Sequence, residues 1–137
     1  MTIVFTNGCF DIIHAGHIQY LEDSKRICQG DKLVVGLNSD ASMERIKRKP
    51  FNTQKNRKRV LEALRIVDEV HIFEEDTPYE LIKKIKPRYI TKGGDYEPED
   101  VVGRDLAQLK IMDTYPAESS TELLEKITKW LDMKKEK

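Results

Sequence analysis

Cysteine is scarce in this 137-residue sequence, and its scarcity excludes several classes of protein. The only two, Cys9 and Cys28, are too few for a disulfide framework and lack the partners of a zinc site. We expect both to be small buried thiols. A redox or nucleophilic role for Cys9 would need a base beside it, which His14 or His17 could supply.

Long hydrophobic runs are missing as well. No apolar run approaches the roughly 20 residues that are needed to span a bilayer. The first residues pass directly into the apolar segment IVF, without the basic region and cleavage site of a secretory signal. The sequence therefore predicts a cytoplasmic protein that does not enter a membrane.

Charge of one sign is not in excess, because 24 Lys and Arg balance 24 Asp and Glu. A neutral chain is not typical of a protein that binds a long nucleic-acid track. The charge is nevertheless uneven, since residues 43–59 hold eight Lys or Arg and a single acid, Glu44. This basic segment favours a compact polyanionic ligand, the alternative being a solvated basic face.

Short apolar segments, rich in β-branched residues, recur along the chain and predict five strands. These segments are residues 2–8, 32–40, 69–75, 88–94 and 109–115. Continuous apolar strands with helices between them are typical of a parallel sheet that is covered on both faces. We therefore predict one α/β domain over residues 1–137, with a frayed tail over about 133–137.

Amphipathic segments between the strands predict the helices. Apolar residues at helical spacing mark residues 16–28 and 54–67. Thr77–Glu80 is predicted to be a capping box with proline at the first helical position, and Pro87 ends that helix. A terminal helix beginning at Ser119 is predicted to bury Leu123, Leu124, Ile127, Trp130 and Leu131.

Ligands of parallel α/β sheets bind beyond the carboxyl ends of the strands. The segments to search are therefore residues 7–17, 38–40, 92–96 and 114–121. The first of these is not a GxGxxG loop, and the sequence contains no GKS or GKT. The usual glycine cradles for phosphate are thus missing.

Two of the three histidines, His14 and His17, stand on either side of Gly16 in the first of these segments. If a helix begins near Gly16, both imidazoles converge on its positive end, where unpaired N–H groups favour an anion. Gly16 lets a phosphate approach the backbone closely. Imidazole donors can stabilise charge on phosphoryl oxygens in a transition state. The pattern predicts phosphate chemistry, with a metal pair that includes Asp11, or a structural histidine, as alternatives.

The stretch Gly8-Cys9-Phe10-Asp11-Ile12-Ile13-His14-Ala15-Gly16-His17 resembles the G-x-F-D-x-x-H-x-G-H signature of the cytidylyltransferase-like nucleotidyltransferases. Further family motifs are matched in the same order by Lys47, by Arg57 with Leu61 and residues 65–70, and by Ser119–Thr121. The resemblance implies a Rossmann-like, doubly wound sheet with helices on both faces. It also implies transfer of a nucleotidyl group from a nucleoside triphosphate to a phosphorylated alcohol, with release of pyrophosphate.

The resemblance and the positions together imply roles for individual residues. His14 and His17 would stabilise charge on the α-phosphate and the pyrophosphate, with Lys47 reaching the phosphates from the basic segment. Arg57 would clamp the triphosphate, and Asp11 would hold Mg²⁺ together with it. Phe10 and Tyr96 lie where they could stack on a base. The nucleotide-binding set is completed by Gly8, Gly16, Lys92, Gly94, Asp95, Ser119, Ser120 and Thr121.

Residues 38–40, 73–78 and 92–96 resemble one subgroup of this family, the heptose 1-phosphate adenylyltransferase domains, which make ADP-heptose for bacterial surface glycans. This resemblance implies ATP and a sugar phosphate as substrates, a homodimer, and no nucleic-acid partner. Thr114 replaces the arginine of glycerol-3-phosphate cytidylyltransferases, whereas Arg65 with Asp68-Glu69 is closer to the cytidylyltransferases. The alternatives are a cytidylyltransferase acting on another phosphorylated alcohol such as glycerol 3-phosphate, and a non-enzymatic nucleotide- or RNA-binding module.

Overall fold

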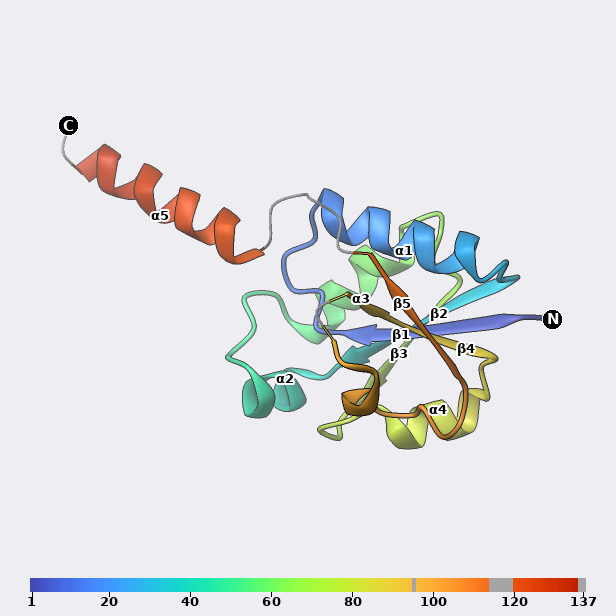
Figure 1. The fold of residues 1–137 in the computed structure, drawn as a ribbon. Coiled ribbons are helices and arrows are strands. Elements are labelled where there is room, and N and C mark those ends of the chain that lie inside the picture. The colour runs from blue at the N-terminus through green and yellow to red at the C-terminus, as the bar shows by residue number, and fades with distance from the viewer. Residues whose placement is uncertain (95, 114–119, 136–137) are drawn as a thin grey trace.

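A five-stranded parallel sheet forms the centre of the computed structural model, which describes residues 1–94, 96–113 and 120–135 (Figure 1). The strands are β1 (Ile3–Gly8), β2 (Lys32–Asn38), β3 (Glu69–Phe73), β4 (Tyr89–Gly93) and β5 (Gln108–Met112). Their order is β3-β2-β1-β4-β5, and each neighbouring pair is parallel. The predicted α/β fold is therefore confirmed, and each strand begins within one residue of its predicted start.

Helices cover both faces of this sheet, as a doubly wound fold requires. The helical elements of the described chain are α1 (Ala15–Ile27), α2 (Asp40–Ile46), α3 (Gln54–Glu62), α4 (Tyr79–Ile85), the 3₁₀ turn η1 (Pro98–Asp100) and α5 (Ser120–Lys135), of which α5 does not cover the sheet. Leu21 of α1 and Leu61 of α3 belong to the core on one face, and Ile82 of α4 belongs to the core on the other. None of the helices in the described parts of the chain is long and apolar enough to cross a membrane.

The two cores follow from the period-two alternation of the central strands. In β1, Val4 points into the first core and Phe5 into the second. Gly36 of β2 lies on the side of Phe5, and a Cβ atom there would stand 2.7 Å from the Phe5 ring. Phe5 therefore packs across the place where a side chain would be.

Two helix boundaries differ from the prediction, and one helix was not predicted. The helix α4 begins at Tyr79 with Pro78 at its N-cap, and no side chain caps it, so the predicted capping box is wrong. The helix α3 ends at Glu62, yet Leu64 and Val67 still pack on the core through the turn that follows. The short helix α2 was not predicted, although Ser39 supplies a normal N-cap by accepting a hydrogen bond from the Ser42 N–H at 3.0 Å.

The terminal helix α5 forms as predicted but is not buried as predicted. It extends away from the sheet in Figure 1, and none of its residues is buried. Leu123 and Leu124 are half-buried, while Ile127, Trp130 and Leu131 are exposed, Trp130 by 54%. The helix continues to Lys135, and residues 136 and 137 of the tail predicted to fray lie outside the described part of the chain.

Candidate active site

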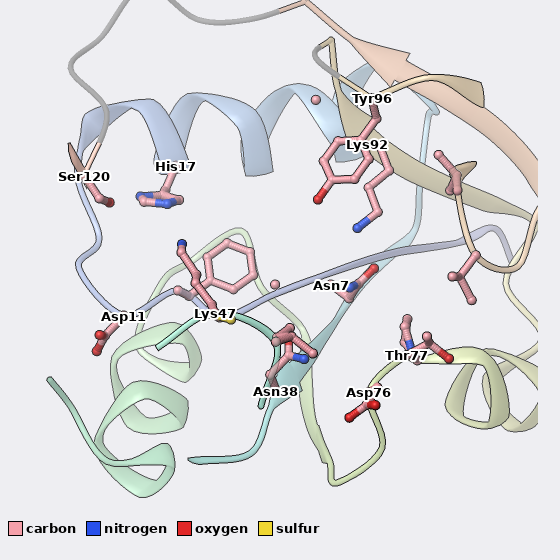
Figure 2. A pocket seen from close by; sticks show the side chains of 18 of the residues that line it. Asn7, Asp11, His17, Asn38, Lys47, Asp76, Thr77, Lys92, Tyr96 and Ser120 are labelled. Atoms are coloured by element: carbon pink, nitrogen blue, oxygen red, sulfur yellow. The ribbon is translucent and has the colours of Figure 1, made fainter. Parts of the chain in front are cut away.

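A cavity of about 680 Å³ opens at the carboxyl ends of the strands (Figure 2). It lies where the strand order reverses, since the chain adds β2 and β3 on one side of β1 and β4 and β5 on the other. This is the topological switch point at which doubly wound sheets bind ligands. The cavity lies among the loops after β1 to β4, the segment that includes η1, and the first residue of α5. Its polar and charged lining consists of Asn7, Asp11, His17, Asn38, Lys47, Arg48, Asp76, Thr77, Lys92, Asp100 and Ser120.

The two histidines form a capping box at the start of α1. Nδ1 of His14, the N-cap residue, accepts a hydrogen bond from the Gly16 N–H at 3.1 Å. Nδ1 of His17 accepts one from the His14 N–H at 3.2 Å. These bonds satisfy unpaired donors of the first turn and bring the ring centroids within 4.1 Å of each other. The predicted pair is therefore assembled, and His17 lines the cavity with His14 beside it.

The capping bonds fix the tautomer of both rings. A neutral imidazole has one donor and one acceptor nitrogen, and Nδ1 is the acceptor in His14 and in His17. The proton of each neutral ring therefore sits on Nε2. The pair thus presents two N–H donors on the side away from the helix backbone.

His17 is neutral at physiological pH. Burial is the largest cause, and the electrostatic effects of His14 and Lys47 act in the same direction; together they lower the pKa of His17 to about 4. His17 therefore meets an anion as a hydrogen-bond donor. A polyanion bound in the cavity would offset the effect of the Lys47 charge on the pKa of His17.

Phe10 packs its ring against the His17 ring. Its backbone is in the left-handed region at φ 45°, which is uncommon for a bulky residue, and its side chain is only 8% exposed. The ring centroids of Phe10 and His17 are 5.6 Å apart. A Cβ atom at Gly8 would stand 3.0 Å from the Phe10 ring, so glycine allows this packing. Phe10 therefore supports the His17 ring, and it also lines the cavity in which it was predicted to stack on a base.

Lys47 ends α2 as its C-cap residue, and Figure 2 shows its amino group pointing toward His17. The predicted lysine therefore stands beside the histidines. Cys9 also lines the cavity, half-buried, and burial is the largest influence raising the pKa of its thiol. A thiol with a raised pKa is a poor nucleophile, which argues against the alternative role for Cys9.

Arg57 does not occupy the predicted place of a triphosphate clamp. Arg57 is 1% exposed, and its guanidinium bonds to the loops around it. Nε donates to the Asn52 carbonyl at 3.0 Å, one terminal nitrogen donates to the carbonyls of Cys9 and Asn38 at 2.8 and 2.9 Å, and the other binds the Asp40 carboxylate at 2.8 Å. Arg57 thus ties together the loops that form the cavity.

Asp11 is engaged in a similar way, which argues against the predicted Mg²⁺ ligand. Oδ2 accepts hydrogen bonds from Arg48 at 2.7 Å and from the Phe51 N–H at 2.8 Å, and Oδ1 accepts one from the Asn52 N–H at 2.8 Å. Burial raises the pKa of Asp11, but these bonds outweigh it and hold the pKa below its usual value. Within the described ranges, no three metal-binding side chains gather in a cluster.

The remaining predicted residues divide into three groups. Lys92 and Ser120 line the cavity, with the Lys92 amino group 4.9 Å from the centre of the Tyr96 ring. The Ser120 hydroxyl donates to the Ile12 carbonyl at 3.3 Å. Gly94 and Thr121 are exposed and are not among the described lining residues, whereas Asp95 and Ser119 lie outside the described part of the chain.

Part of the opposite wall was missed: Asn38 lies in a segment that was searched, but Asp76 and Thr77 were not predicted as site residues. Figure 2 places Asn38, Asp76 and Thr77 across the cavity from His17 and Lys47. Asp76 and Thr77 come shortly after β3, so the rule that searches the carboxyl end of every strand would have found them.

Comparison with known proteins agrees with this geometry. A sequence model of the cytidylyltransferase-like family matches residues 5–126. The chain therefore belongs to the cytidylyltransferase-like family, as the resemblance of its histidine motif implied.

Several curated proteins are similar to this chain over most of its length. Proteins named bifunctional protein HldE from Aliarcobacter butzleri and Wolinella succinogenes are 51% and 52% identical to it over 128 residues, which is 91% of this chain. The chain spans only about a quarter of their length, 26% and 27%. Among solved structures, a lipopolysaccharide core biosynthesis protein from Thermoplasma volcanium superposes with a TM-score of 0.73 at 28% identity, covering 86% of this chain and 99% of that one.

Proposed function

We propose that the chain is a nucleotidyltransferase that transfers the adenylyl group of ATP to a sugar phosphate, D-glycero-D-manno-heptose 1-phosphate, forming ADP-heptose. The observation that carries the proposal is the pair of histidine donors at the helix start, with Lys47 beside them, at the switch point of the sheet. The name of the similar lipopolysaccharide core biosynthesis protein supports a product used in surface glycans.

The proposed reaction is an in-line displacement. An oxygen of the sugar phosphate attacks the α-phosphorus of ATP, a new P–O bond forms, and the bond to the bridging oxygen breaks with loss of pyrophosphate. The attacking phosphate is already ionised near neutral pH, so no general base is required. Catalysis then consists of positioning and charge stabilisation, which the Nε2 donors of His14 and His17 and the ammonium of Lys47 supply.

We also propose that Mg²⁺ enters with the triphosphate. The described residues contain no cluster of metal-binding side chains, and the carboxylate of Asp11 is turned toward the backbone of residues 51 and 52. Mg²⁺ commonly binds substrate phosphates with few protein ligands.

The opposite wall suits the sugar. Asp76 pairs with Arg45 at 2.8 Å, and its carboxylate would repel a phosphate group but can accept hydrogen bonds from hydroxyl groups. Asn38 and Thr77 add polar groups of the kind that bind polyols. Lys92 points into the cavity from β4, where it can reach a phosphate (Figure 2). We therefore propose that the acceptor lies between Lys92 and the wall of Asn38, Asp76 and Thr77.

Pyrophosphate release tests the proposed substrates. We expect release with ATP and heptose 1-phosphate, and at least tenfold less with CTP or with glycerol 3-phosphate. A preference for CTP would identify a cytidylyltransferase instead. A salt-sensitive gel shift with RNA, together with no transfer to either acceptor, would support the non-enzymatic alternative and overturn the proposal.

We further propose that the chain works as a cytoplasmic homodimer. Both cysteines are free, which suits a reducing compartment. The chain exposes 8749 Å² of surface at 16.0 kDa, whereas a compact monomer of that mass exposes about 7,400 Å². The exposed apolar side chains of α5 contribute to this excess, as the face of a helix that has a partner would.

Light scattering after size exclusion tests the dimer. We expect about twice the monomer mass of 16.0 kDa for the wild type, and the monomer mass for Trp130→Glu. Lys129→Glu, an exposed neighbour on the same helix, should leave the dimer intact. A monomeric wild type would contradict this assignment.

A further inference from the structure

A seven-residue loop with three adjacent basic residues, residues 47–53, connects α2 to α3 and begins with Lys47. We call it the basic loop. Its cations at positions 47–49 repel one another, and the loop has few apolar contacts, since Phe51 is exposed. Nothing in its own sequence explains why it should hold one conformation over the cavity. Its order has to come from contacts with the rest of the chain.

Asp11 makes four hydrogen bonds to this loop from a distant part of the sequence. Its carboxylate binds Arg48 at the start of the loop and the N–H groups of Phe51 and Asn52 near its end. Its carbonyl accepts a further hydrogen bond from the Asn52 side chain at 2.7 Å. The Asp11 side chain is 4% exposed, so these bonds form in a site that is nearly free of water.

These contacts fix the loop on both sides of a turn. The Arg48 guanidinium lies 4.3 Å from the centre of the Phe51 ring, so the two segments held by Asp11 also pack on each other. Arg48 is the residue directly after Lys47, and the backbone N–H groups of both bond to the Met43 carbonyl at the end of α2. A displacement of Arg48 would therefore move Lys47 as well.

We infer that Asp11 is a positioning residue, which folds the basic loop so that Lys47 stands beside His17 in the cavity. The inference rests on the proposed function only for its effect on activity, because the fold of the loop can be measured without substrate. A metal ligand would contribute to activity independently of Lys47. A positioning residue acts through Lys47, so the effects of Asp11 and Lys47 on activity should not be independent. A double-mutant cycle measures this dependence.

The first readout is the titration of His17 followed by NMR, which needs no activity. Lys47 is one of the groups that lower the pKa of His17, so Lys47→Met should move the midpoint upward from about 4. Asp11→Asn should also move it upward, because Lys47 leaves the ring. Loss of the negative charge of Asp11 alone would move the midpoint downward, so the sign of the shift separates the two explanations.

The second readout is the kinetic cycle. We expect Asp11→Asn to lower kcat/KM for ATP by about a hundredfold, as small misplacements of a positioned group do. Combined with Lys47→Met, it should cause no loss beyond that of Lys47→Met alone. Arg48→Gln should act in the same direction but more weakly, and Lys49→Gln, an exposed neighbour in the basic loop, should change neither readout.

The outcomes separate the inference from the proposed function. A downward or absent shift of the His17 midpoint in both Asp11→Asn and Arg48→Gln overturns the inference. So does an Asp11→Asn loss that persists in the Lys47→Met background with a changed requirement for Mg²⁺. A wild type without transfer activity, but with the expected upward shifts, would overturn the proposed function and leave the positioning role of Asp11 supported.

Discussion

Replacing either histidine with a residue that lacks the imidazole donor is expected to lower kcat by about a hundredfold or more. Each ring presents an Nε2 N–H to the charge that develops in the transition state. Alanine alone would be a poor test, since both side chains also cap α1 and a lost cap costs about 1 kcal/mol. His14→Ser keeps an acceptor at the N-cap, and His17→Gln keeps one at the third position of the capping box. Both variants remove the imidazole donor.

The measurement is kcat together with the free energy of unfolding in urea. We expect His14→Ser and His17→Gln to unfold close to the wild type and to lose activity. His17→Ala should lose the same activity and also some stability. Turnover near the wild-type level in both conservative variants would remove the histidines from the mechanism.

Replacing Arg57 with methionine is expected to destabilise the fold by about 3 kcal/mol. The change leaves the carbonyls of Cys9, Asn38 and Asn52 without their donor, and breaks an ion pair of which one member is fully buried. Such a loss is a large part of the roughly 5–15 kcal/mol that stabilises a typical domain.

Urea unfolding of Arg57→Met measures this effect, with Arg59→Met as its control. Arg59 is exposed on the same helix, and its replacement should change the free energy of unfolding by less than about 0.5 kcal/mol. Arg57→Lys should be intermediate, because it keeps the charge but cannot reach all four acceptors. Near-normal stability of Arg57→Met, with a strongly raised KM for ATP, would restore the triphosphate clamp predicted from the sequence.

The sheet and the histidine loop could be predicted because their signals are local. Period-two alternation in Val4 and Phe5 determines which core each enters, and the spacing of His14 and His17 places both rings at one helix end. The start of each strand was predictable for the same reason. In these cases, a residue's neighbours in the sequence determine its surroundings in the fold.

The errors concern residues whose role depends on distant partners. Arg57 and Asp11 have the charges expected of ligands for a nucleotide and a metal, yet each is engaged by carbonyls or N–H groups from other loops. The apolar stripe of α5 predicted burial, but amphipathicity shows which face is apolar and not what covers it. A sequence pattern does not record those partners.

The two uses of the imidazoles at the start of α1 limit which substitutions the chain can accept at these positions. In each ring, Nδ1 accepts a capping hydrogen bond at the start of α1, and Nε2 is left as the donor for a ligand. A substitution that changes the donor at one histidine also removes a capping bond of α1. It therefore destabilises the first turn, which positions the other ring. Substitutions that change substrate preference should therefore destabilise the chain less on the opposite wall, around residues 76 and 77, than at the two histidines.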